Sequence, residues 1–125
     1  MAEIKVTDLK LPGVKIIEPR IFSDNRGYSG ETYSIQELEK HGITYNFVLD
    51  YEAYNMKKYT LRVIHFQNNP HPQTKLVRVL SGEILDFVVD LRKDSPTYKK
   101  WISHKLSSEN HKQILIPNGF GHAFV

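Results

Sequence analysis

The sequence contains no cysteine, so neither a disulfide framework nor thiolate chemistry is open to this chain. It also has no apolar run near the length of about 20 residues that a membrane-spanning helix needs. Residues 1–12 lack the apolar core of a secretory signal peptide. These three absences predict a cytoplasmic protein that does not cross a membrane.

Charge of one sign is not concentrated in any part of the chain. The formal net charge is +3, but the lysines and arginines are scattered rather than gathered into a stripe. This distribution disfavours nucleic-acid binding. A diffuse positive balance is typical of an ordinary solvated surface, and it would equally suit an anionic small molecule such as a nucleotide or sugar phosphate, so both interpretations stay open.

Helical signals are scarce, and only one place carries them. Ser34-Ile35-Gln36-Glu37 has the form of a capping box and Gly42 supplies a stop, which predicts one short helix near residues 35–41. Other runs are β-branched or aromatic and lie between turn residues, at 14–17, 45–50, 59–67, 75–80, 84–91, 98–106 and 113–116. The pattern predicts a single all-β domain over residues 1–125, built as a sandwich or a barrel.

The clearest predicted hairpin joins residues 75–80 to residues 83–91 through Ser81-Gly82. Alternation along its second strand predicts one core face and one mixed face. In a small barrel, a charged side chain that points inward usually marks a ligand cavity, and Lys75 is a candidate for that position. A lysine at the start of a strand can also blunt a sheet edge or reach solvent, so its direction stays open.

Two titratable residues, His65 and Lys75, lie inside apolar, strand-like runs. Burial of an imidazole or an ammonium is costly unless the group is paired, and it moves the pKa of a histidine or lysine downward. A downward shift is the condition for proton-transfer chemistry near neutral pH. This pair is therefore the first candidate for a catalytic site. The alternative for His65 is a hydrogen-bonded core histidine, or one that faces outward.

The run Ile116-Pro117-Asn118-Gly119-Phe120-Gly121-His122 contains a Pro-x-Gly-x-x-His spacing, which predicts a tight turn that delivers a histidine onto the next strand. This spacing resembles the second half of the cupin barrel signature. Metal-binding cupins add an earlier His-x-His with a glutamate, whereas this chain has His65-Phe66-Gln67. A bound metal is therefore disfavoured. His71 lies between two prolines, and we expect it in a loop facing solvent.

Six blocks follow one another along nearly the whole chain, at residues 24–28, 61–67, 73–83, 89–97, 106–110 and 116–124. Together they resemble the dTDP-4-dehydrorhamnose 3,5-epimerase family. The resemblance implies a cofactor-free, cupin-type β-barrel (a jelly roll) that forms a homodimer by exchanging N-terminal strands. It also implies an isomerase of dTDP-rhamnose biosynthesis that inverts C3 and C5, the carbons beside the 4-keto group of a nucleotide-linked 6-deoxyhexose.

The resemblance assigns the chemistry to the same two residues. His65 would be the base that removes the acidic protons at C3 and C5, and Lys75 would stabilise the negative oxygen of the enolate. A neutral imidazole can take such a proton, and a fixed cation beside a developing enolate lowers the barrier in a dry cavity.

Four further residues would bind the substrate by the same resemblance. Arg26 and Arg62 would hold the diphosphate, Glu31 the nucleotide, and His122 would lie near the sugar. A guanidinium suits the diphosphate because it offers several donors without titrating. Strict strand alternation would place Arg62 and His65 on opposite faces, so either a bulge separates them or Arg62 serves a neighbouring subunit's cavity.

The chain departs from the family pattern at several positions. Val63 stands where the family usually has glycine, Ser29 stands where an aromatic residue is common, and Leu49-Asp50-Tyr51 replaces a polar Gln-Asp-Asn. The last change removes polar groups expected at the nucleotide, so the base need not be thymine.

The family supplies an aspartate that orients the base and a tyrosine acid from strands that would follow Val125, so we expect the chain to lack those strands. Three functions remain open at this point. They are the 3,5-epimerase, a mono-epimerase or 3,4-ketoisomerase on a related nucleotide sugar, and an inactive cupin that binds a nucleotide sugar.

Overall fold

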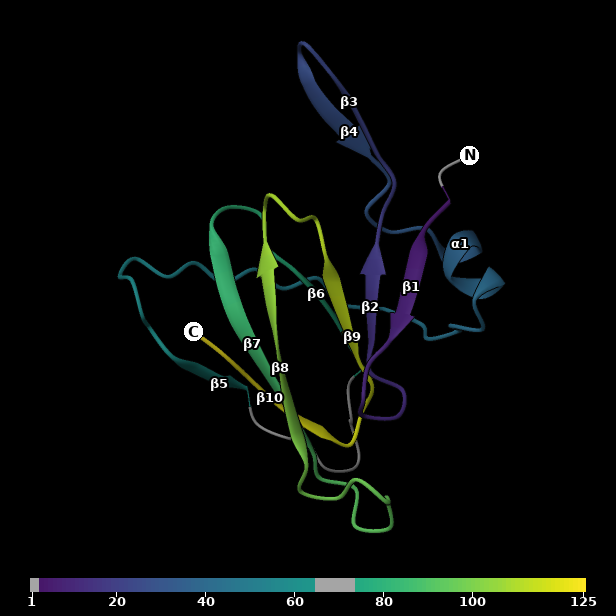
Figure 1. Cartoon of the computed structure of the whole chain (residues 1–125), viewed down its shortest axis with the longest axis vertical. Helices are drawn as coiled ribbons and strands as arrows, with labels where there is room; N and C mark the ends of the chain where they lie inside the picture. Colours follow the sequence, from purple (N-terminus) through teal and green to yellow (C-terminus); the bar gives the residue numbers. More distant parts are fainter. Residues whose placement is uncertain (1–2, 65–73) are drawn as a thin grey trace.

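In a computed structural model of the chain, the described residues are 3–64 and 74–125, and most of their regular structure is β-strand. Two four-stranded sheets, each antiparallel throughout, make up the body (Figure 1). Sheet 1 has the order β1 (Lys5–Asp8), β2 (Lys15–Glu18), β9 (Gln113–Ile116), β6 (Lys75–Arg78). Sheet 2 has the order β5 (Arg62–Ile64), β10 (Phe120–Phe124), β7 (Glu83–Asp90), β8 (Trp101–Ser107).

A separate two-stranded hairpin consists of β3 (Ile21–Asp24) and β4 (Gly27–Gly30). Figure 1 shows this hairpin projecting beyond the end of the two sheets, with Arg26 in its turn. The helix α1 (Ile35–Lys40) follows it and lies beside β1 and β2. The hairpin is therefore the part of the described chain that reaches farthest from the body.

The main core lies between the two sheets. Ile16, Ile114 and Ile116 of sheet 1 are buried in one cluster with Val88, Leu106 and Phe120 from the other side. A second cluster lies on the opposite face of sheet 1, where Ile17 and Leu115 pack against Leu38 of α1 and Ile43. Sheet 1 is thus covered on both faces, which explains why all four residues of β9 are buried.

The prediction of an all-β chain with one short helix is confirmed. Ser34 is the N-cap of α1 and its hydroxyl accepts a hydrogen bond from the amide of Glu37 at 3.3 Å, while Gly42 takes a positive φ of 74° just after the helix. The strand predicted over residues 45–50 is wrong. That segment forms no β ladder, and Val48 and Leu49 are exposed. Residues with a high β propensity form a strand only where a neighbouring strand can pair with them, and this segment has no such neighbour among the described residues.

The predicted hairpin of residues 75–80 and 83–91 is also wrong. The turn exists and Gly82 has a φ of +85°, but β6 pairs with β9 whereas β7 pairs with β8 and β10. The turn therefore carries the chain from one sheet to the other. It puts Asp86, Val88 and Asp90 of β7 on the buried face, so the inward face is the one that carries two carboxylates.

The glycines of the Pro-x-Gly-x-x-His run allow β10 to lie close to its neighbours. Gly119 has a φ of +94°, and a Cβ there would lie 2.7 Å from the Arg92 side chain. At Gly121 a Cβ would lie 2.8 Å from the Val89 side chain. The turn thus brings His122 onto β10 beside β7, as the sequence predicts.

Candidate functional site

A row of four paired positions, three of them polar, crosses the inner face of sheet 2. Directly paired residues of antiparallel strands share a face of the sheet. Arg62 pairs with Phe124, Phe124 with Asp86, and Asp86 with His104, so these four positions lie side by side on four strands. His122 lies two residues before Phe124 and therefore shares this face.

The centre of this face is a buried hydrogen-bonded pair. Nε2 of His122 and Oδ2 of Asp86 are hydrogen-bonded across 2.7 Å, and the two side chains are 1% and 0% exposed. Burial raises the pKa of the Asp86 carboxyl, while the hydrogen bond from His122 and the neighbouring charges of His122, His104 and Lys75 act in the opposite direction. When the Asp86 carboxyl is ionised its oxygens only accept, and the imidazole proton of this contact then lies on Nε2.

Lys75 faces this pair from sheet 1. It is paired with Ile116, whose side chain lies in the core between the sheets, so Lys75 also points inward. Burial lowers the pKa of the half-buried Lys75 ammonium, and the charge of Asp86 opposes that shift. Lys75 therefore faces the space between the sheets although β6 is the last strand in the order of sheet 1.

The fourth titratable group on this side is His104. Burial and the nearby charge of Lys112 lower the pKa of its imidazole, while Asp86 and Glu18 act in the opposite direction. A lower pKa favours the neutral ring, which can exchange protons without a permanent charge. Neither His104 nor Asp86 was among the residues predicted for the site. The alternation of residues along β7 could have identified Asp86. Once the buried face of this strand is known, the alternation places the Asp86 carboxyl on that face.

Two further residues predicted for the site are Arg62, which lies in the same row as Asp86, and His65. Arg62 lies at the end of the inner row, where its Nη2 donates to the carbonyl of Tyr54 at 3.0 Å and its Nε to the side chain of Asn55. His65 lies outside the described residues. Arg62 thus shares the face of Asp86 and His122, while the predicted position of His65 in the same cavity stays a prediction.

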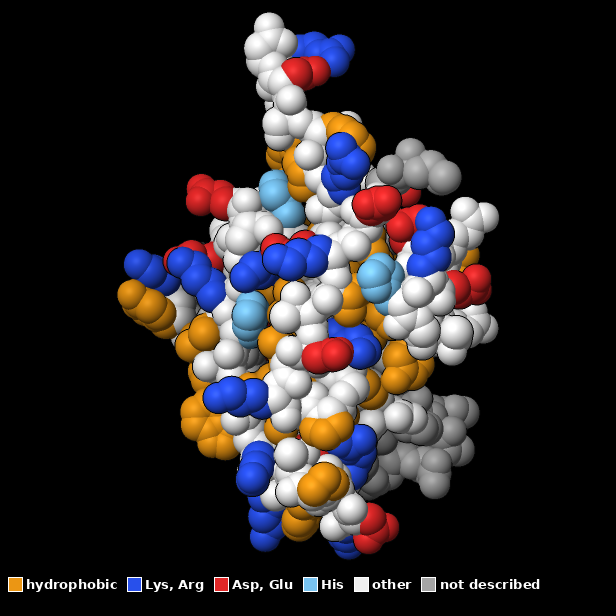
Figure 2. All heavy atoms as spheres, turned by 45° about the vertical axis from the view of Figure 1, so that its right-hand side comes forward, with side chains coloured by type: hydrophobic (Ala, Val, Ile, Leu, Met, Phe, Trp, Pro, Cys, Tyr) orange, Lys and Arg blue, Asp and Glu red, His pale blue; other side chains and the backbone are white. Residues whose placement is uncertain are grey.

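Arg26 and Glu31 are not brought to this cluster. Arg26 lies in the turn of the projecting hairpin, is paired with Asp24 at 2.6 Å and has a side chain that is 87% exposed. Glu31 follows β4 and is also exposed. Figure 2 shows the hairpin tip standing clear of the body, and lysine, arginine and acidic side chains interspersed over the face in view.

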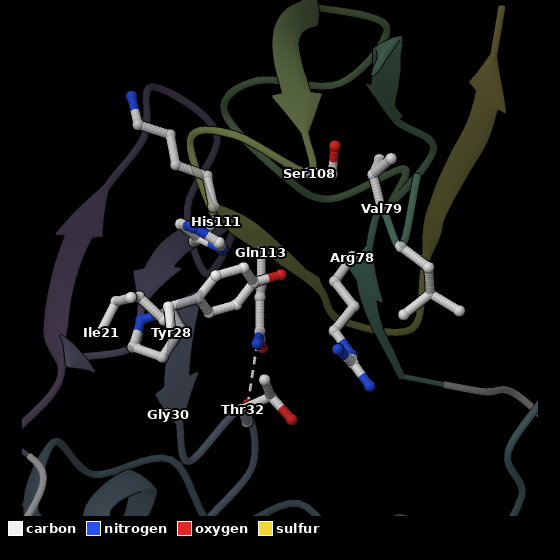
Figure 3. Close-up of a pocket in the computed structure, with 12 residues that line it drawn as sticks. Ile21, Tyr28, Gly30, Thr32, Arg78, Val79, Ser108, His111 and Gln113 are labelled. Carbon is white, nitrogen blue, oxygen red and sulfur yellow. Dashed lines mark hydrogen bonds between the residues drawn. The ribbon is translucent and has the colours of Figure 1, made fainter. Parts of the chain in front are cut away.

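A small pocket of about 80 Å³ lies on the other face of sheet 1, beneath the root of the hairpin (Figure 3). The ring of Tyr28 meets that of His111 edge-on at 4.7 Å, and Arg78 points into the pocket from β6. The buried Gln113 donates from Nε2 to the carbonyl of Thr32 at 2.8 Å. These contacts hold the hairpin root, while the hairpin's tip remains exposed.

Within residues 3–64 and 74–125, no three histidine, aspartate or glutamate side chains gather closely enough to hold a metal ion. The helix in the same part of the chain is too short to cross a bilayer.

Comparison with known proteins identifies the family. The family model described as dTDP-4-dehydrorhamnose 3,5-epimerase matches residues 8–125. The dTDP-4-dehydrorhamnose 3,5-epimerase of Methanothermobacter thermautotrophicus is 44% identical over 125 residues, which are 100% of this chain and 66% of that protein. That of Salmonella typhimurium is 45% identical over 92% of this chain and 63% of its own length. The chain therefore spans about two thirds of the length of the curated relatives it matches.

A solved structure agrees with this assignment. The crystal structure of dTDP-4-dehydrorhamnose 3,5-epimerase from Bacillus anthracis str. Ames, with TDP and PPi bound, superposes with a TM-score of 0.94 at 47% identity. The match covers 97% of this chain and 69% of that chain. The cupin-type fold class predicted from the sequence is confirmed by this likeness. The chain belongs to the dTDP-4-dehydrorhamnose 3,5-epimerase family.

Proposed function

We propose that this chain carries the site of a dTDP-4-dehydrorhamnose 3,5-epimerase, which inverts C3 and C5 of a nucleotide-linked 4-keto-6-deoxyhexose. The support is the family membership together with the name of the Bacillus anthracis relative and the TDP bound to it. The proton at each of these carbons is acidic because the neighbouring ketone accepts the electrons as an enolate. The reaction therefore needs a base and a cation near the keto oxygen.

The single observation that carries the proposal is the inward ammonium of Lys75, opposite the buried Asp86–His122 pair. A cation fixed in a water-poor interior stabilises a negative enolate oxygen far better than one in bulk water. In the proposed reaction His65 takes the proton from C3 or C5, the electron pair moves onto the keto oxygen beside Lys75, and a proton returns from the opposite face. Arg62 lies at the end of the same row and is exposed, so a diphosphate could reach it.

The test is the rate of product formation by a Lys75→Met variant. Methionine keeps most of the volume and removes the charge, so we expect a loss of roughly 10²–10³-fold in kcat, the usual cost of a missing oxyanion stabiliser. Lys105→Met is the matched control, because Lys105 is an exposed lysine of β8 that pairs with Glu83 at 2.8 Å. The proposal fails if both variants keep the activity of the parent protein.

We further propose that the active protein is a homodimer in which the β3–β4 hairpin of one subunit enters the site of the other. The hairpin projects from the body, and it carries an exposed Phe22 together with the exposed Arg26. Among the N-terminal strands, β2 is already paired on both sides within sheet 1, so the exchange is proposed for the hairpin.

Subunit complementation tests this arrangement. An Arg26→Ala chain and a Lys75→Met chain are each prepared, shown to be weakly active, and then mixed under conditions that exchange subunits. If Arg26 serves the partner's site, a mixed dimer has one intact site of two, so a random mixture recovers roughly a quarter of the parent activity. If Arg26 serves its own subunit, mixing recovers nothing, and sedimentation as a monomer would reject the dimer itself. The cytoplasmic location remains a prediction.

A further inference from the structure

The base and the enolate stabiliser do not explain why the chain buries an aspartate against a histidine. Asp86 and His122 are almost fully buried and hydrogen-bonded, and Asp86 Oδ1 and His122 Nδ1 have no hydrogen-bond partner within the described residues. A buried carboxylate is costly unless its surroundings compensate it. Asp90, the other buried carboxylate of β7, is compensated by Arg92, Ser95 and Thr97. Among residues 3–64 and 74–125, no arginine or hydroxyl group bonds Asp86 in that way.

The groups that face Asp86 come from four strands. His122 on β10 makes the hydrogen bond, His104 on β8 is its paired neighbour, and Lys75 on β6 faces it from the other sheet. Arg62 on β5 lies farther along the same row and is bound to Asn55 and Tyr54. Among these described groups, Asp86 is the only carboxylate, and the other four can all carry positive charge.

We propose that Asp86 is a positioning residue for the reaction proposed above: its carboxylate holds the His122 imidazole through Nε2–H and supplies the negative charge that balances the Lys75 ammonium across the interior. The first contact fixes the tautomer, so Nδ1 keeps its lone pair and stays unprotonated. The second keeps Lys75 charged in a setting that favours the neutral amine. A neutral Lys75 could not stabilise an enolate oxygen as a cation.

The electrostatic half of the proposal is tested by NMR titration of the Lys75 side chain in the full chain. Asp86→Asn removes the charge with little change in volume, and we expect the titration midpoint of Lys75 to move to lower pH. Glu83→Gln is the control, since it removes one negative charge from the exposed end of the same strand, where its partner is Lys105. An unchanged midpoint in Asp86→Asn would overturn the proposal, as would an equal shift in the control.

A reciprocal variant covers the case in which Asp86→Asn does not fold. Coupling between two groups acts equally on both, so Lys75→Met must raise the pKa of the Asp86 carboxyl if the two charges interact. Lys75 is only half buried, and methionine suits an apolar interior. Carbon NMR of the Asp86 carboxyl gives the titration directly, and the absence of a shift would reject the coupling.

The positioning half is tested on the unaltered protein by nitrogen NMR of His122. We expect Nε2 to have the chemical shift of a protonated nitrogen and Nδ1 that of an unprotonated one. A ring protonated on Nδ1 alone would contradict the arrangement. None of these three measurements depends on turnover, so they decide the proposal even if the protein proves inactive.

The catalytic consequence is read from the pH dependence of the reaction. In Asp86→Asn the decline of kcat at high pH, where Lys75 loses its proton, should begin at a lower pH than in the parent protein. If the parent protein is inactive, the proposed function fails while the NMR measurements stand. If the parent is active and the profile of Asp86→Asn is unchanged, the positioning role fails while the proposed function stands.

Discussion

Replacing Asp90, the last residue of β7, by asparagine should destabilise the fold, because the Asp90 carboxylate holds the turn that follows this strand. The Asp90 side chain is fully buried, and its carboxylate accepts hydrogen bonds from the backbone amide of Arg92 at 3.0 Å, from Arg92 Nε at 3.0 Å and from Arg92 Nη2 at 3.1 Å. The hydroxyls of Ser95 and Thr97 donate to it as well. The same Arg92 lies over the Phe120 ring, 4.4 Å from its centroid, so the network supports the turn before His122.

The size of the effect follows from these contacts. A net hydrogen bond to a charged group contributes about 1.5–3 kcal/mol, and breaking a buried ion pair costs about 3–5 kcal/mol. Asparagine retains one acceptor, and the Arg92 side chain is 38% exposed and can regain water, so the lower end applies. We expect a loss of about 3 kcal/mol, which for a chain of this size lowers Tm by roughly 11 °C.

The pH dependence gives a sharper test. Burial alone would raise the pKa of Asp90, but the hydrogen bonds from Arg92, Ser95 and Thr97 outweigh it, so the pKa lies below the ordinary value of 3.8. A carboxyl with a lowered pKa in the folded state stabilises the fold above the unfolded pKa and loses that contribution as the pH falls toward the folded value. The difference between the two proteins should therefore be full at neutral pH and shrink below 3.8.

Urea unfolding followed by circular dichroism at a series of pH values measures this difference. Asp94→Asn is the control, because Asp94 lies exposed in the same turn, and its free energy of unfolding should change by no more than about 0.5 kcal/mol. A gap between Asp90→Asn and the parent that stays constant from neutral to acid pH would refute the electrostatic reasoning. Equal stability at neutral pH would refute the network's importance altogether.

Two further changes probe the packing around the site. Gly121→Ala should lower the free energy of unfolding by roughly 1–3 kcal/mol and slow product formation, because its Cβ would push β10 away from Val89. Adding Val89→Ala should restore part of the stability and part of the rate. Chemical denaturation and an activity assay measure the two effects, and an unchanged Gly121→Ala protein would show that the clash is absent. Ser34→Ala should cost about 1 kcal/mol by removing the N-cap of α1, measured by thermal unfolding, and should leave activity unchanged since α1 packs on the outer face of sheet 1.

The parts of the structure that could be predicted from the sequence are those fixed by local chemistry. The capping box at Ser34 and the stop at Gly42 bound α1 because cap hydrogen bonds form within one turn of the chain. The turn at Gly119 could be predicted for the same reason, since it needs a residue that adopts positive φ. Such signals require no knowledge of which strands become neighbours.

The wrong predictions concern long-range pairing. A turn at Ser81-Gly82 is compatible both with a hairpin and with a crossing between two sheets, and residue types alone do not distinguish these outcomes. The choice decides which face of β7 is buried, and with it whether Asp86 points into the interior. Asp86 therefore could not be assigned to the site before the sheets were known, whereas Lys75 could be named from its apolar surroundings.

The proposed function requires the chain to remove protons from the carbons beside the keto group, and solvent exchange tests this step most directly. The protein is incubated with dTDP-4-keto-6-deoxyglucose in heavy water, and the recovered sugar is examined by mass spectrometry and proton NMR. We expect deuterium at C3 and C5, with the rate of exchange reduced strongly in Lys75→Met and little in Lys105→Met. Deuterium at C3 alone would indicate a mono-epimerase. A bound but unlabelled sugar would contradict the account and indicate a protein that only binds nucleotide sugars.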